Sequence, residues 1–174
     1  MTIETDRLLL TPWTEADRPA FLAMASDPEV MWDYGAPWSE AEKHSRFERH
    51  LEAFARDGFG KWALRRKEDP VWLGYCGISP IWPSLAIAPG LEVGWRLSRA
   101  AWGQGFATEA SAGALKDIFR RTTEAEIACF AVPDNARSFA VMRRLGLRRT
   151  PERDFLYENG IPAIMHVADR EAWS

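Results

Sequence analysis

The stretch Trp102-Gly-Gln-Gly-Phe-Ala-Thr-Glu-Ala110 is the most informative part of this chain. It joins the apolar run Leu91-Glu-Val-Gly-Trp-Arg-Leu97, which predicts a buried strand, to a periodic run that predicts a helix over 105–121. Glycines at the start of a helix let the backbone approach a ligand closely, and the first helical N–H groups have no partner within the helix. With the helix dipole added, this pattern predicts a site for a phosphate or pyrophosphate.

The same residues exclude two other phosphate motifs. No Gly-Lys-Ser or Gly-Lys-Thr follows, as the phosphate loop of ATPases requires, and the dinucleotide fingerprint needs three glycines after an early strand. A glycine turn before a helix is a weak signal by itself. A tight turn that binds nothing therefore remains open as the alternative.

The flanking motifs strengthen the ligand interpretation. Trp102-x-x-Gly105-x-Ala107 resembles the acyl-CoA loop of the GNAT superfamily of N-acyltransferases, in the branch of ribosomal-protein N-terminal acetyltransferases. The opening Ile3-Glu-Thr-Asp-Arg-Leu-Leu-Leu10 and the blocks Val132-Pro-Asp-Asn-Ala-Arg-Ser138 and Leu145-Gly-Leu147 also resemble that branch, in the same order. The resemblance implies a single GNAT domain over residues 1–174 that transfers an acetyl group from acetyl-CoA to a primary amine.

Composition sets the class of protein. With 174 residues, 47% of them hydrophobic, the chain can bury one full core. The net charge of −3 argues against a nucleic-acid partner. There is no secretory signal and no apolar run of the ~20 residues that span a membrane. We therefore expect a cytoplasmic protein with no membrane partner. Cys76 and Cys129 lie in apolar runs and are expected to be buried thiols without a disulfide.

The order of expected elements predicts an α/β (α+β) domain with a mixed sheet between helices, in three layers. In the fold that the resemblance implies, strands 91–97 and 126–132 diverge, and the pantetheine arm of the cofactor enters the gap. Strands are expected at 7–11, 59–66, 71–79, 91–97 and 126–132 with two more near the C-terminus, and helices at 14–25, 39–57, 105–121 and 135–145.

The resemblance also implies how acetyl-CoA is bound. Backbone groups of Trp95 to Leu97 are expected to pair with the pantetheine amides as an added strand would, although the Trp95 indole can equally be core. Asn135 is expected to contact the pantetheine region and can also cap a helix. The pyrophosphate is expected at the loop that begins with Trp102, on the N–H groups of Gly103, Gln104, Gly105, Phe106 and Ala107, with Thr108 close by.

For the chemistry, Glu92 is the expected general base, acting on the amine through water; a solvated strand face is the alternative. Many GNAT enzymes carry a tyrosine four residues before the glycine that corresponds to Gly146. That tyrosine is the acid that protonates the departing thiolate. Here that position is Met142, which leaves Ser138 as the candidate, with a capping or packing hydroxyl as its alternative. The resemblance implies direct attack in a ternary complex, without a covalent enzyme intermediate.

The acceptor is expected to be a protein N-terminus or a small amine. Segments 31–38 and 80–90 and the start of the second helix are expected to line its pocket, although aromatic residues are also ordinary core material. No histidine has metal-ligand spacing, so no metal is expected. The missing tyrosine keeps open an inactive acyl-CoA-binding sensor or interaction module, and a homodimer is compatible with the family. The aromatic residues expected in the pocket are Trp32, Tyr34, Trp38 and Trp82.

Overall fold

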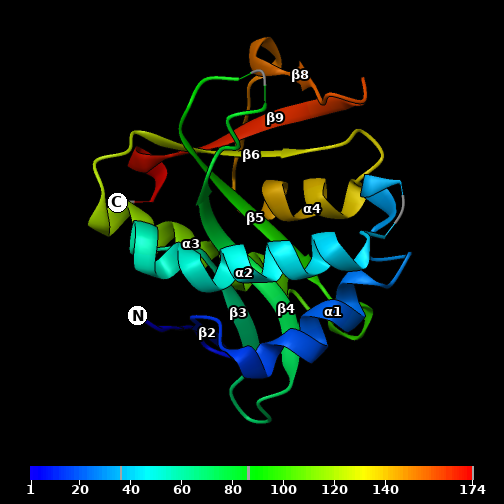
Figure 1. The fold of residues 1–174 in the computed structure, drawn as a ribbon. Coiled ribbons are helices and arrows are strands. Elements are labelled where there is room, and N and C mark those ends of the chain that lie inside the picture. The colour runs from blue at the N-terminus through cyan, green and yellow to red at the C-terminus, as the bar shows by residue number, and fades with distance from the viewer. Residues whose placement is uncertain (36, 86, 174) are drawn as a thin grey trace.

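The computed structural model describes residues 1–35, 37–85 and 87–173 of the chain. Figure 1 shows a twisted sheet with helices packed on both of its faces. The predicted three-layer domain is thereby confirmed. The strands are β1 (Ile3–Glu4), β2 (Leu8–Thr11), β3 (Lys61–Arg66), β4 (Trp72–Pro80), β5 (Leu91–Leu97), β6 (Glu126–Ala131), β7 (Arg148–Arg149), β8 (Phe155–Leu156) and β9 (Pro162–Asp169), and the helices are α1 (Arg18–Ala25), α2 (Glu40–Asp57), α3 (Phe106–Arg121) and α4 (Ala136–Arg144).

The sheet runs in the order β1-β2-β3-β4-β5-β6-β9-β7, with β8 paired to β9. Every neighbouring pair is antiparallel except β5 and β6, which are parallel. These two strands share one register pair, Glu92 with Ala128, and separate beyond it. The mixed sheet and its diverging central strands are therefore as predicted.

The two faces of β5 serve different layers. Val93 and Leu97 pack into the core beneath α3, whereas Glu92 and Arg96 point to the opposite face, which α1 and α2 cover. This alternation follows from the two-residue period of a strand. One side of the sheet therefore carries the main apolar core, and the other carries charged side chains below α2.

Local signals explain the bounds of α2. Ser39 accepts a hydrogen bond from the Glu42 N–H at 3.3 Å, and the Glu42 carboxylate accepts one from the Ser39 N–H at 2.9 Å, as a capping box requires. The helix ends at Gly58, whose φ of 72° lies in the left-handed region that glycine adopts without strain. Both ends agree with the predicted ones. No helix among the described residues is long and apolar enough to cross a membrane.

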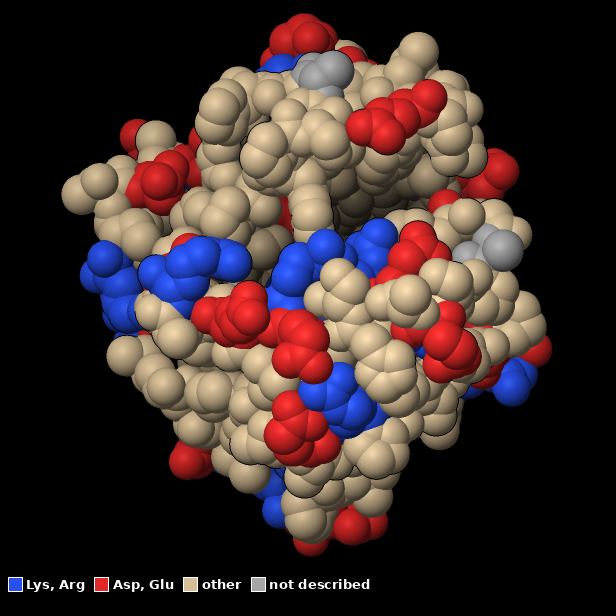
Figure 2. All heavy atoms as spheres, in the orientation of Figure 1, with Lys and Arg blue, Asp and Glu red and all other residues tan. Residues whose placement is uncertain are grey.

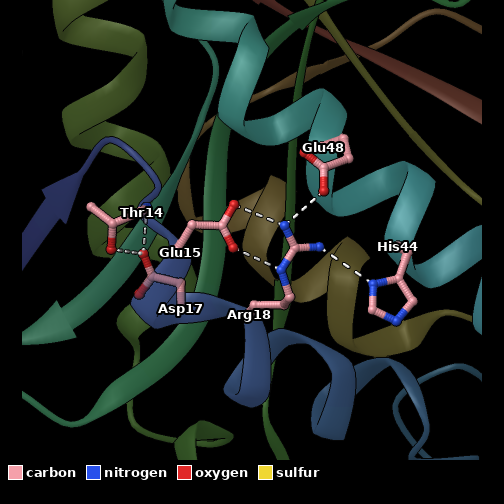
Figure 3. A network of polar contacts seen from close by, with 6 residues as sticks. All are labelled: Thr14, Glu15, Asp17, Arg18, His44 and Glu48. Carbon is pink, nitrogen blue, oxygen red and sulfur yellow. Dashed lines mark hydrogen bonds and ion pairs between the residues drawn. The ribbon is translucent and has the colours of Figure 1, made fainter.

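A polar network ties α1 to α2 (Figure 3). Arg18 of α1 pairs with Glu15 at 2.8 Å and with Glu48 of α2 at 2.7 Å, and its guanidinium lies 3.3 Å from Nδ1 of His44. The same guanidinium stands 4.2 Å from the centre of the Phe47 ring. These contacts fix the angle between the two helices and give His44 a surface role.

The observed elements differ from the predicted ones in several places. The segment 15–17 forms a 3₁₀ turn ahead of α1, because the Asp17 N–H bonds to the Thr14 carbonyl three residues back. Strand β3 begins at Lys61 and not at Phe59. Strands β1 and β7 were not predicted, since two residues are too few to show a periodic pattern.

Candidate functional site

The glycine loop, residues 102–108, leaves a row of backbone donors open. Gly103 and Gly105 have φ values of 72° and 80°, and the loop is exposed from residue 103 to 105. Phe106 anchors the loop, because its side chain is buried in the core below α3. None of the N–H groups of residues 103–108 donates a hydrogen bond to another described residue. These donors are therefore available to an anion at the N-terminus of α3.

A clamp from the N-terminal strands holds this loop. The Glu109 carboxylate accepts hydrogen bonds from the Thr5 hydroxyl at 2.5 Å and from the Arg7 N–H at 2.8 Å, and it pairs with the Arg7 guanidinium at 2.7 Å. Arg7 also donates to the Gln104 carbonyl at 3.0 Å. Burial alone would raise the pKa of Glu109, but the bonds from Thr5 and Arg7 outweigh it and lower the pKa. Two sequence motifs thus meet in one structural unit.

The backbone of β5 faces the gap beside β6. The Ser98 N–H donates to the Leu73 carbonyl at 2.9 Å, which fixes the hydrogen-bonding phase between β4 and β5. Because that phase alternates in an antiparallel pair, Trp95 and Leu97 turn their N–H and C=O groups away from β4. The Trp102 indole N–H donates to the Leu97 carbonyl at 2.9 Å, and the Trp95 ring packs against the core. The two N–H groups and the Trp95 carbonyl remain open, and the expected added strand would use them.

Helix α4 lies next to the same gap. The Asn135 side chain caps it by accepting a hydrogen bond from the Ser138 N–H at 3.0 Å, so its predicted capping role is confirmed. Ser138 lies half-buried in the first turn. Met142 is 1% exposed and belongs to the core, and its thioether has no proton to donate. In the first turn of α3, the Thr108 hydroxyl is buried without a hydrogen-bond partner among the described residues.

Glu92 sits in a buried ion pair. Its carboxylate lies 2.8 Å from the Lys61 ammonium and accepts a hydrogen bond from Ser79 at 3.0 Å. Burial by itself would lower the pKa of Lys61, but the negative charge of Glu92 outweighs it and the pKa is raised. Gly94 leaves room for this lysine, since a β-carbon there would stand 3.1 Å from its nitrogen. Glu92 is 7% exposed, so the alternative of a solvated strand face is wrong.

Residues 7–148 match the acetyltransferase (GNAT) domain family. The chain belongs to the GNAT acetyltransferase family. It is 26% identical over 168 residues to the uncharacterized N-acetyltransferase YoaA of Bacillus subtilis, a match that covers 95% of this chain and 93% of that protein. An acetyltransferase of Agrobacterium tumefaciens has the same fold, with a TM-score of 0.84, 24% identity and coverage of 97% and 94%. RimL, the ribosomal L7/L12 alpha-N-protein acetyltransferase, in complex with coenzyme A, matches with a TM-score of 0.74, 18% identity and 99% coverage of both chains.

The family uses acetyl-CoA, and membership supports an acyltransferase enzyme. The fit of the glycine loop to an anion is consistent with that co-substrate. Neither cysteine is suited to covalent catalysis, because Cys76 and Cys129 are free and buried. Burial raises the pKa of the Cys76 thiol to about 12. Among the described residues, no three His, Cys, Asp or Glu side chains are grouped as metal ligands would be.

The four aromatic residues expected in the acceptor pocket of this GNAT protein divide into two groups. Trp32, Tyr34 and Trp82 are exposed, and Tyr34 is 48% exposed. Trp38 is 8% exposed and packs in the core below α2, where its ring centre lies 5.1 Å from that of Tyr34. The prediction that Trp38 lines an acceptor pocket is therefore wrong, because its ring is packed into the core. Segments 31–38 and 80–90 each include one residue outside the described ranges.

Sequence reasoning missed the basic character of this face. Arg46 of α2 stands 4.0 Å from the centre of the Trp38 ring, and Arg49 stands 4.7 Å from that of Trp82. Figure 2 shows Lys and Arg side chains gathered along a hollow between α2 and the strands β6 and β9. The i,i+3 spacing of the two arginines places them on one face of α2, but their aromatic partners come from distant segments. Local sequence patterns do not predict that pairing.

His50 of α2 packs against aromatic rings and is uncharged near pH 7. It stacks on Trp13 with ring centres 4.7 Å apart and lies 5.0 Å from Tyr75. Burial, followed by the positive charges of Lys61 and Arg49, lowers the pKa of His50 to about 3. The ring is therefore uncharged near pH 7. Its contacts with aromatic rings agree with the prediction that His50 is a core or surface residue.

Proposed function

We propose that this GNAT protein transfers the acetyl group of acetyl-CoA to a primary amine by direct attack. The amine nitrogen bonds to the thioester carbonyl carbon, the carbon–sulfur bond breaks, and the nitrogen loses one proton. The observation that carries the proposal is the row of unpaired N–H groups from residue 103 to 108, beside the open edge of β5. Holding both reactants in one place can itself lower the barrier by several kcal/mol, about 7 or more in well-oriented cases.

In this proposal, the backbone of residues 103–107 binds the pyrophosphate of the co-substrate. The open groups of Trp95 and Leu97 bind the pantetheine arm, and Asn135 keeps its amide nitrogen for the same region. The Thr108 hydroxyl, unpaired and buried, gains a partner when the site is filled. Together these groups direct the thioester into the gap between β5 and β6.

Glu92 acts as the general base through water, and Lys61 and Ser79 position its carboxylate. Ser138 serves the departing thiolate, directly or through water, in place of the acid that Met142 lacks. A thiol with a pKa near ~8.5 does not strictly need an acid, so this role is modest. We expect Ser138→Ala to lower the turnover rate more than it weakens coenzyme A binding. A turnover rate within about twofold of wild type would remove Ser138 from the mechanism.

The cofactor site is tested by a glutamate placed on the loop. Gly105→Glu puts a negative charge where the pyrophosphate is expected, and we expect acetyl-CoA binding measured by calorimetry to be lost. Gly58→Glu is the matched control, because Gly58 also has a positive φ, has nothing within 4 Å of an added β-carbon, and lies at the end of α2. Unchanged affinity in Gly105→Glu, with both variants folded, would refute the loop assignment.

An amine panel separates the transferase from an inactive acyl-CoA-binding module. We expect release of the coenzyme A thiol above background with at least one class of primary amine, either small amines or the α-amine of short peptides. The structural likeness to RimL, a ribosomal-protein acetyltransferase, supports including peptide N-termini. Tight acetyl-CoA binding without release for any amine would favour the sensor or interaction module.

A further inference from the structure

Two arginines beside the proposed acceptor site have no acidic partner. Arg46 and Arg49 are half-buried, lie one helical turn apart on α2, and form no ion pair with any described residue. Each is held against an aromatic ring, Arg46 on Trp38 and Arg49 on Trp82. Cation–π contacts of this kind fix the direction of a guanidinium and leave its N–H donors open.

Three acids near the two arginines have other partners. Asp33 binds Arg96 with two contacts of 2.9 Å, and Glu92 is paired with Lys61. Glu42, which lies one turn before Arg46 on α2, uses its carboxylate to cap the helix at Ser39. Arg46 acts on Glu42 only through its charge, and none of these three acids forms an ion pair with either arginine.

Arg46 and Arg49 lie close enough for their positive charges to act on each other. Burial lowers the pKa of Arg49, and the charge of Arg46 lowers it further. His50, on the same helix, is neutral near pH 7 and adds no charge of its own. Tyr34 lies between two of the cations, with Arg96 at 4.8 Å and Arg46 at 5.7 Å from its ring centre. An anionic group that bound here would contact the two oriented guanidinium groups and the aromatic ring of Tyr34.

We propose that the acceptor amine carries a carboxylate, and that Arg46 and Arg49 bind it while the amine points toward Glu92. The inference rests on the proposed function and names its substrate class. Guanidinium groups match the geometry of a carboxylate with two parallel hydrogen bonds. The same charges repel a second cationic group, so diamines and polyamines are poor acceptors.

Matched amines test the assignment by turnover. Each pair has one amine with a free carboxylate and the same amine as its carboxamide, in two sets: free amino acids, and short peptides with Glu or Gln at the second position. We expect wild type to prefer the carboxylate member, and Arg46→Gln and Arg49→Gln to reduce that preference by about tenfold or more without changing the KM for acetyl-CoA. The set that shows the preference identifies the source of the carboxylate.

Arg56→Gln is the control on the same helix, because Arg56 is exposed and pairs with its neighbour Asp57. It should keep the wild-type preference. Equal or better rates for the carboxamides in wild type would overturn the inference while leaving the transferase proposal intact. A rise in the KM for acetyl-CoA in the arginine variants would also overturn it, because the arginines would then bind the co-substrate.

A binding measurement covers the case in which no amine in the panel reacts. N-acetylglycine, a product-like carboxylate, is titrated into the coenzyme A complex, with N-acetylglycinamide as the neutral control. We expect N-acetylglycine to bind to wild type and to Arg56→Gln, and not to Arg46→Gln/Arg49→Gln. Failure of N-acetylglycine to bind wild type, or equal binding to all variants, would overturn the inference whatever the turnover result.

Discussion

At the scale of single residues, Glu92 shows how neighbouring residues orient a side chain and so determine what it can do. Its position on β5 was predicted from the strand pattern and the family resemblance. Its ion-pair partner Lys61 lies on β3, and Ser79, which donates a hydrogen bond to it, lies on β4. A carboxylate held in this way keeps one direction, which a base acting through water requires.

Glu92→Gln is expected to lower kcat by about 100-fold, because an amide cannot accept the amine proton. It also leaves the Lys61 charge buried and unpaired, which destabilises the fold. Glu92→Gln/Lys61→Gln removes both charges and is expected to regain stability without regaining turnover. Thermal unfolding and initial rates measure the two effects. Recovery of both together would mean that Glu92 acts only through the stability of the fold.

The pKa of His50 predicts a dependence of stability on pH. Because the pKa is about 3 in the folded chain and 6.5 in the reference state, only the unfolded chain takes up this proton between those values. The free energy of unfolding should therefore fall as the pH drops below 6.5, by up to about 1.4 kcal/mol per pH unit from this group.

His50→Phe keeps a ring against Trp13 and should flatten that fall in urea unfolding followed by tryptophan fluorescence. His44→Gln, on the exposed side of the same helix, should retain the wild-type slope. The same slope in His50→Phe as in wild type would show that the ring is protonated in the folded protein.

At the scale of elements, α3 depends on the N-terminal strands for its direction. The Glu109 carboxylate receives the Thr5 hydroxyl, the Arg7 backbone and the Arg7 guanidinium, so the first turn of α3 is tied to the residues between β1 and β2. Its position in the first turn also suits the helix dipole. The clamp connects the glycine loop to a sheet edge and holds the N–H groups in one orientation.

Glu109→Gln is expected to lower the free energy of unfolding by about 1 kcal/mol, because Arg7 is half exposed and screening weakens the pair. We expect acetyl-CoA affinity to fall as well, since the loop loses one of its supports. Glu68→Gln, in the exposed turn between β3 and β4, makes the same change of charge and should alter neither quantity. Calorimetry that finds equal affinity in all three proteins would separate the clamp from the cofactor site.

At the scale of the whole molecule, the sheet consists of two parts joined through β5 and β6. The antiparallel pairs on either side are long, with seven register pairs between β4 and β5 and six between β6 and β9. Between the two parts there is one pair, Glu92 with Ala128. A ligand in this gap would replace the missing strand contacts and connect the parts.

Amide hydrogen exchange tests that arrangement. The N–H groups of Trp95 and Leu97 face the gap, whereas the N–H of Arg96 faces β4. On binding acetyl-CoA, we expect exchange at Trp95 and Leu97 to slow by at least about tenfold relative to any change at Arg96. Equal slowing at all three positions would indicate a general gain in stability without a bond from the ligand to the β5 edge.

The sequence by itself determined the elements and the loop. Gly105, the Ser39 capping box and the alternation along β5 are local signals, because each depends on backbone angles or on residues a few positions apart. These signals located the starts of α2 and α3, the central strand and the open N–H groups, and the order of motifs indicated the family.

Only the tertiary structure decided which side chains meet. Arg7 and Glu109 are 102 positions apart, and Arg49 of α2 packs against Trp82 in the segment that follows β4. It placed Trp38 in the core, and it gave Glu92 a lysine as its partner. The physical reason is that long-range partners depend on how the faces of the sheet and helices pack, whereas short-range patterns specify only which faces exist. The positively charged face around Arg46 and Arg49 is therefore a property of the folded chain.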